Sequence, residues 1–220
     1  VGAEPLPRGV RTRGCHPGHD ASVERARPHG GPLHRSRGRS TVTPPILITS
    51  HEVASQYLPT PAGRTLSGIV SIGDFRSGPP TGFAKHAAPK LRLEFDDVDL
   101  ESHPAGYAGA TIKDVRNLIR FGTDDPSPFG ETPVLVHCGA GISRSSACAL
   151  VLLYLRLNSE EAAVTALLES VRYAEAMRLR VPGQEILPNR RVLFLADQEL
   201  GSSLLNEVSH RFDYQRDWGQ

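Results

Sequence analysis

One stretch constrains this chain more than any other: two apolar segments joined by a short glycine-containing loop, between residues 133 and 155. Residues 133–136 form a short apolar run of the kind found in buried strands. Residues 145–155 are apolar and rich in good helix formers. The loop between them, Cys138 to Arg144, therefore has to connect a strand directly to a helix.

A strand–loop–helix connection of this kind favours anion binding. The backbone N–H groups of the loop and of the helix start converge there without partners, at the positive end of the helix dipole. Gly139 and Gly141 let the backbone approach an anion closely. We therefore predict that Gly139, Ala140, Gly141, Ile142 and Ser143 form an anion-binding loop.

Two side chains at the ends of this loop, Cys138 and Arg144, could react with and bind a phosphate. Cys138 opens it, where converging amides and a helix N-terminus stabilise the thiolate form. Arg144 closes it with a planar fork that suits two oxygens of a phosphate. A thiolate beneath such a phosphate is set for in-line attack on phosphorus, and Ser145 can hydrogen-bond the sulfur when it leaves. Because Arg and amides stabilise the charge, we expect no metal and no cofactor.

The string His137-Cys138-Gly-Ala-Gly-Ile-Ser-Arg144-Ser145 resembles the signature loop of the cysteine-dependent protein tyrosine phosphatase superfamily. It looks most like the dual-specificity branch and its small bacterial members. The resemblance runs from about residue 46 to about residue 201 and implies a phosphatase-like fold and a phosphocysteine intermediate. It also implies that His137 supports the Cys138 region without transferring protons, and that Asn189 is structural.

Such a phosphatase needs a general acid to protonate the leaving oxygen and then, as a base, to activate water. Asp97, the last residue of the predicted strand 91–97, is the first acid past its alternating pattern, and the resemblance aligns the family's acid best with it. Asp96 continues the polar face of that strand, where Arg92 could hold it. The loop that follows is longer than in the family, so Asp96 and Asp99 stay as alternative acids. Alternatively, these three carboxylates belong to a solvated surface loop that takes no part in catalysis.

Alternating elements predict the fold. We expect strands at 46–49, 65–72, 91–97 and 133–136, and helices at 51–58, 111–121, 145–155, 160–177 and 190–200, followed by a polar tail. This order indicates an α/β fold with a central, mostly parallel sheet flanked by helices. Because sites in such sheets lie beyond the carboxyl ends of the strands, Cys138 and Asp97 should share one cleft. We expect Cys148 in the core, and His86 and Lys85 on the solvated surface.

The N-terminal segment differs from the rest. Residues 1–43 carry a net charge of +5 from eight Arg and three acids, with no Ile, Phe, Tyr, Trp or Met. We predict a disordered basic extension there and a single phosphatase domain at 44–220. A basic arm for nucleic acid is one interpretation, but we favour a misassigned start codon and do not expect nucleic acid as a partner.

No run spans a bilayer, and the N-terminus lacks the pattern of a signal peptide. Three cysteines suit a reducing cytoplasm. We therefore predict a cytoplasmic monomer, without membrane partners, that acts on a phosphorylated protein or a small phosphomonoester. The alternatives are a rhodanese-like sulfurtransferase, which the Arg-Ser ending and the acidic loop disfavour, and a non-catalytic phosphopeptide-binding pseudophosphatase. A phosphoinositide phosphatase is disfavoured because the loop contains no lysine.

Overall fold

The structure is a computed structural model that describes residues 46–99, 106–124, 127–212 and 214. The predicted extension at 1–43 lies outside these residues, so both interpretations of it stay predictions. Within the described ranges, no helix has the length and apolar character needed to cross a membrane.

Four strands form one sheet. They are β1 (Ile46–Ser50), β2 (Gly68–Gly73), β3 (Lys90–Glu94) and β4 (Val134–Cys138), in the order β1-β4-β2-β3. Every neighbouring pair is parallel, with Ser50 opposite Cys138 and Gly73 opposite Glu94. The predicted α/β class with a parallel central sheet is confirmed, and the carboxyl ends of all four strands lie at one edge.

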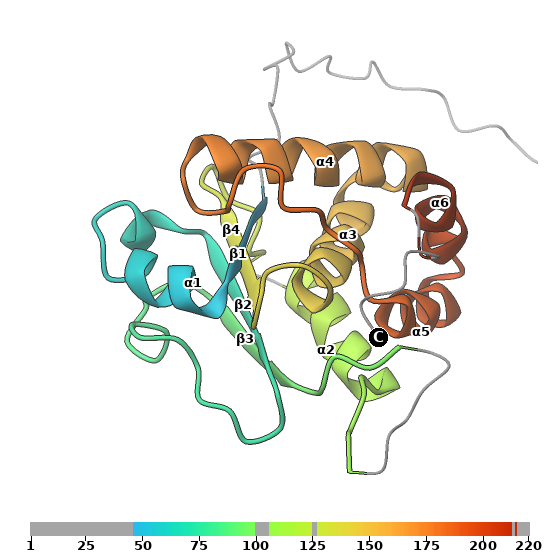
Figure 1. Cartoon of the computed structure of the whole chain (residues 1–220), viewed down its shortest axis with the longest axis horizontal. Helices are drawn as coiled ribbons and strands as arrows, with labels where there is room; N and C mark the ends of the chain where they lie inside the picture. Colours follow the sequence, from blue (N-terminus) through green and yellow to red (C-terminus); the bar gives the residue numbers. More distant parts are fainter. Residues whose placement is uncertain (1–45, 100–105, 125–126, 213, 215–220) are drawn as a thin grey trace, which may run out of the picture. The chain divides into compact units, whose positions relative to one another are not determined.

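Helices cover both faces of this sheet (Figure 1). Alternate residues of β1 separate the two cores: Ile46 and Ile48 pack in the larger core with α2 to α6, whereas Leu47 packs in the smaller core with α1. The helices are α1 (His51–Tyr57), α2 (Ile112–Thr123), α3 (Arg144–Leu157), α4 (Glu160–Ala176), α5 (Arg190–Leu200) and α6 (Leu204–Arg211), and one 3₁₀ turn, η1, lies at Gly63–Thr65.

Four helices begin at side chains that cap their first turn. Ser50, Thr111, Ser159 and Asn189 each accept a hydrogen bond from a backbone N–H of the following turn. Such caps satisfy N–H groups that the helix itself leaves unpaired. They explain why the starts of α1, α2, α4 and α5 agree with the predicted starts to within one residue.

Two predicted strands are shorter than expected. Strand β2 begins at Gly68 and not at residue 65, because the N–H groups of Thr65 and Leu66 donate within the η1 turn at 3.2 and 3.4 Å. Strand β3 ends at Glu94 and not at residue 97. Beyond it, the N–H of Asp96 donates to the carbonyl of Ala108 at 2.7 Å, which draws the chain away from the sheet.

The prediction of a solvated surface position was wrong for His86. The residue is buried, its Nε2 lies 2.8 Å from the carbonyl oxygen of Gly63, and its Nδ1 accepts from the N–H of Ala88. These two hydrogen bonds make it a structural link between η1 and the loop before β3. Lys85 is exposed, as predicted.

The predicted polar tail after residue 200 contains a further helix. Leu204 and Val208 of α6 are buried against the larger core. The N–H groups of Leu204 and Leu205 donate to the carboxylate of Asp197 at 2.8 and 3.0 Å. Asp197 of α5 therefore starts α6, a long-range cap that the sequence pattern did not indicate.

Candidate active site

The candidate site lies where β4 ends and α3 begins. Cys138 is the last residue of β4 and Arg144 is the first residue of α3, so residues 138–144 form the predicted tight connection. Gly141 has φ of +76°, and a Cβ at this position would lie 2.7 Å from the carbonyl carbon of Thr49 in β1. Only glycine combines this dihedral with this close approach.

The carbonyl groups of the 138–144 loop are bound from outside the loop. The carbonyl of Gly139 accepts from the N–H of His51 at 3.1 Å, and that of Gly141 accepts from the guanidinium of Arg180. Backbone N–H groups of Leu187 and Asn189 donate to the next two carbonyls, those of Ile142 and Ser143, each at 3.2 Å.

A trans peptide holds its C=O and the following N–H on opposite sides. Because the carbonyls of residues 139, 141, 142 and 143 are bound from outside, the N–H groups of residues 140, 142, 143 and 144 point the other way, into the loop. The structure thus brings together the backbone groups that the sequence predicted for anion binding.

The sulfur of Cys138 lies at the base of this loop. It accepts from the N–H of Gly141 at 3.2 Å and lies 3.2 Å from Oγ of Ser145. Cys138 and Ser145 are both buried. The predicted contact between the thiol and Ser145 is therefore present.

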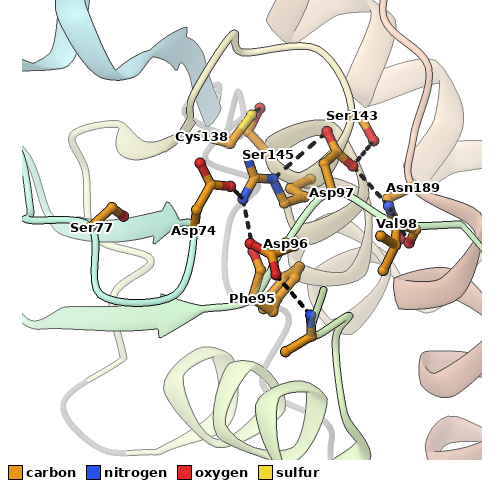
Figure 2. Close-up of polar contacts among 12 residues, drawn as sticks. Asp74, Ser77, Phe95, Asp96, Asp97, Val98, Cys138, Ser143, Ser145 and Asn189 are labelled. Carbon is orange, nitrogen blue, oxygen red and sulfur yellow. Dashed lines mark hydrogen bonds and ion pairs between the residues drawn. The ribbon is translucent and has the colours of Figure 1, made fainter. Parts of the chain in front are cut away.

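Arg144 is buried, and one side of its guanidinium is occupied by protein groups. Its Nη1 donates to Oδ1 of Asp74 and to the carbonyl of Phe95, each at 2.7 Å (Figure 2). Its Nε is buried and makes no hydrogen bond, although Oδ2 of Asp97 lies 3.7 Å away. The edge formed by Nε and Nη2 is thus the one left for two oxygens of an anion.

The three acids of the 96–99 segment have different surroundings. Asp97 reaches the loop: its Oδ1 accepts from Oγ of Ser143 at 2.7 Å and from Nδ2 of Asn189 at 2.9 Å. Asp96 accepts from the N–H of Ala108 at 2.7 Å, and Asp99 pairs with Arg190 at 3.7 Å. Asp97 thus contacts the 138–144 loop directly, through the hydroxyl of Ser143.

The expected contact between Arg92 and Asp96 is not found, because other partners hold Arg92. Its Nη1 donates to Ser71 at 2.8 Å and its Nη2 donates to Ser77. It also lies 3.4 Å from Glu94. Arg92 therefore joins β3 to β2 and to the loop after β2.

His137 is a buried supporting residue. Its Nε2 lies 2.8 Å from Oγ of Ser71, which in turn accepts from Arg92. Burial lowers the pKa of His137 to about 4, and the nearby Arg92 and Arg144 also lower it. The ring is thus neutral at physiological pH, which fits a supporting group better than a proton carrier.

Sequence reasoning missed two residues of the site, Asp74 and Arg180. Asp74 directly follows β2 and binds Arg144; its place at the carboxyl end of a strand was the available signal. Arg180 is buried and binds the carbonyls of Gly141, Gln184 and Glu185. No local pattern indicated that a connector residue would hold the loop from behind.

A hollow of about 320 Å³ adjoins the loop. Its walls include Asp97, Ile142, Leu187 and Tyr214. The hollow is therefore bounded both by the loop and by the acid that reaches it. Among the described residues, no group of three or more His, Cys, Asp or Glu side chains is arranged to hold a metal ion.

No protein-family model matches the sequence, and no match is found among curated proteins. Several solved structures are similar to this chain. PTPMT1 in complex with PI(5)P is 16% identical, over 75% of this chain and 90% of that chain, with a TM-score of 0.41. Tk-PTP in the active form is 15% identical, over 76% and 90%, also with a TM-score of 0.41.

The third is the human tyrosine phosphatase-like serine/threonine/tyrosine-interacting protein, 21% identical over 60% of this chain and 74% of that chain, with a TM-score of 0.40. All three are phosphatases or phosphatase-like proteins by name. At these scores and identities the likeness does not decide an activity, which has to be inferred from the residues of the site.

Proposed function

We propose that this chain is a phosphatase that hydrolyses phosphomonoesters, with phosphotyrosine as the first substrate to test and phosphoserine and phosphothreonine as the next. One observation carries the proposal: the sulfur of Cys138 accepts from the N–H of Gly141 at the base of the loop, and Arg144, at the end of the same loop, keeps an Nε that makes no hydrogen bond. A phosphate bound there would present its phosphorus to the thiolate.

In the first step, the Cys138 thiolate attacks phosphorus and forms an S–P bond while the bond to the leaving oxygen breaks. Asp97 gives its proton to that oxygen, which departs as an alcohol. The loop amides and Arg144 bind the three equatorial oxygens, where the charge is spread in the transition state.

In the second step, Asp97 takes a proton from water, and the hydroxide formed attacks the phosphocysteine. The S–P bond breaks and inorganic phosphate leaves. The sulfur departs as a thiolate, which Ser145 stabilises from 3.2 Å. Because Arg144 and the amides supply the positive charge, the proposed mechanism uses no metal and no cofactor.

The decisive experiment compares Cys138→Ser and Arg144→Lys with the wild type. Cys138→Ser should abolish turnover while still binding inorganic phosphate, and Arg144→Lys should be severely impaired because a point charge cannot replace the bidentate fork. Cys148→Ala, which removes a buried thiol of α3, is the matched control and should retain turnover. Substantial turnover by Cys138→Ser would end the covalent mechanism.

The same preparation separates the alternative functions. A sulfurtransferase would convert thiosulfate and cyanide, and a pseudophosphatase would bind a phosphopeptide without releasing phosphate. We expect release of phosphate and no sulfur transfer. The cytoplasmic location and the monomeric state stay predictions.

A further inference from the structure

The carboxylate of Asp97 has two unequal oxygens. Oδ1 accepts two hydrogen bonds, from Ser143 at 2.7 Å and from Asn189 at 2.9 Å (Figure 2). Within the described part of the chain no group donates to Oδ2, which lies 3.7 Å from Nε of Arg144. The two lone pairs of Oδ1 are therefore used, and a proton on Oδ1 would face two donors.

The amide of Asn189 can take only one orientation. Its Oδ1 accepts from the N–H of Val192 at 3.0 Å as the cap of α5, so Nδ2 must lie on the other side. There Nδ2 donates to Asp97 and also to the carbonyl of Val98 at 3.2 Å. A flipped amide would set a donor against Val192 and an oxygen against the carboxylate.

The hydroxyl of Ser143 is also committed to Asp97. Ser143 is the N-cap position of α3, yet its side chain makes no capping hydrogen bond. Its Oγ donates to Asp97 instead. The hydroxyl of Ser143 therefore binds the carboxylate of Asp97 and not the backbone N–H groups that an N-cap serine usually binds.

We propose that Ser143 and Asn189 are positioning residues for the general acid: they hold Oδ1 of Asp97 so that the proton is carried by Oδ2, the oxygen beside Arg144. The inference rests on the proposed phosphatase mechanism. The backbone N–H of Asn189 also donates to the carbonyl of Ser143 at 3.2 Å. One residue thus joins the start of α5, the 138–144 loop and the acid.

Ser143→Ala tests the first contact with little risk to folding, because its hydroxyl caps no helix. We expect kcat/KM for phosphotyrosine to fall about tenfold or more, the value of a hydrogen bond to a charged group. An activated aryl phosphate, whose phenol leaves without protonation, should lose much less. Ser143→Thr, which retains a hydroxyl, should restore most of the loss.

Asn189→Ser tests the second contact, because serine can still cap α5 but is too short to reach Asp97. We expect the same dependence on the leaving group. Ser159→Ala, which removes the cap of α4 far along the chain, is the matched control for a lost helix cap. This control should lower the stability of the protein without changing the ratio of kcat/KM for phosphotyrosine to kcat/KM for the activated aryl phosphate.

Repeating Ser143→Ala and Asn189→Ser in an Asp97→Asn background separates positioning from structural damage. If both residues act through Asp97, neither substitution should cost further rate in that background. Inhibition by inorganic phosphate should be unchanged throughout, which would show an intact loop.

Three results would overturn the inference. Equal losses with both substrates, or a full loss that persists in the Asp97→Asn background, would mean that these residues act through the loop. If Asp97→Asn shows no loss that depends on the leaving group, Asp97 is not the general acid. The phosphocysteine mechanism would still stand in that case, provided that Cys138→Ser is inactive. Turnover by Cys138→Ser would instead reject the proposed function itself.

Discussion

At the scale of single residues, the chemistry of the site depends on how protein groups hold the guanidinium of Arg144. Arg144 is fixed by Asp74 and by the carbonyl of Phe95, each at 2.7 Å, so only its remaining edge can bind an anion. Asp74 is exposed over 63% of its side chain, and its negative charge therefore costs little to keep beside the site. Because Nη1 is already fixed, the guanidinium of Arg144 loses less conformational entropy when an anion binds to its Nε–Nη2 edge.

The first residue-scale prediction separates the neighbouring acids. Asp97→Asn should slow phosphotyrosine hydrolysis by about 10²–10⁴, the usual contribution of a general acid, and slow an activated aryl phosphate less. Asp96→Asn is the matched control; its carboxylate binds Ala108, so the ratio of the two rates should stay near that of the wild type. Steady-state rates with both substrates decide the matter. If Asp96→Asn shows the leaving-group effect and Asp97→Asn does not, the acid is Asp96.

The second residue-scale prediction concerns oxidation. Dilute peroxide should inactivate the enzyme by converting the Cys138 thiolate to a sulfenic acid, and inorganic phosphate should protect it. Burial raises the pKa of Cys148, and this thiol lies within the larger core. Mass spectrometry after mild oxidation should therefore show no Cys138–Cys148 crosslink, and finding one would mean that the buried Cys148 thiol comes within reach of Cys138.

Secondary-structure elements meet at the site through their ends. Strand β4 supplies Cys138, α3 supplies Arg144, and the cap of α5 supplies Asn189. The helix starts could be predicted because caps and apolar periodicity are local signals. The start of β2 and the whole of α6 could not, because a 3₁₀ turn and the remote cap Asp197 decide them.

The element-scale prediction tests how tightly the 138–144 loop packs on β1. Gly141→Ala should abolish phosphate binding and turnover, since the new Cβ would lie 2.7 Å from backbone of Thr49 and the loop would have to move. Gly201→Ala is the matched control: φ is +63° there, but a Cβ would meet nothing within 4 Å. It should cost only about 1–2 kcal/mol of left-handed strain and leave phosphate binding intact. Calorimetric binding of inorganic phosphate, with thermal melting, distinguishes the two. A Gly141→Ala variant with normal binding would mean that the loop is not held against β1.

Across the whole molecule, the parallel sheet brings residues far apart in sequence to one edge. Alternating elements were enough to predict that Cys138 and Asp97 follow strand ends at the same edge. The strand order β1-β4-β2-β3 was not predictable, and it is this order that sets β4 between β1 and β2. The contacts of Asp74, Arg180 and Asn189 depend on that arrangement. Of the three residues, Arg180 left no local trace in the sequence, whereas Asp74 was signalled by its place after a strand and Asn189 by the family resemblance.

The first whole-molecule prediction concerns residues 1–43. Their composition offers few apolar side chains for a core, so a chain that starts at residue 44 should retain its turnover and melting temperature. Kinetics and thermal melting of the two chains side by side provide the test. A large loss of either would show that the segment contributes to the folded unit or to its activity.

The second whole-molecule prediction links His137 to acid stability. Its pKa is lowered to about 4 by burial, whereas an unfolded histidine titrates near 6.5. Between these values the unfolded chain binds more protons, so stability should fall as the pH drops from about 6.5 towards 4, by about 2 kcal/mol at pH 5 from this residue alone. His137→Gln cannot take up that proton, so urea unfolding at pH 7 and pH 5 should show a smaller loss for the variant than for the wild type. His210→Gln, at an exposed position of α6, is the control and should follow the wild type. If the free energy of unfolding falls equally for His137→Gln and the wild type between pH 7 and pH 5, His137 is not the source of the fall. The other titrating groups, which both proteins share, would then account for it.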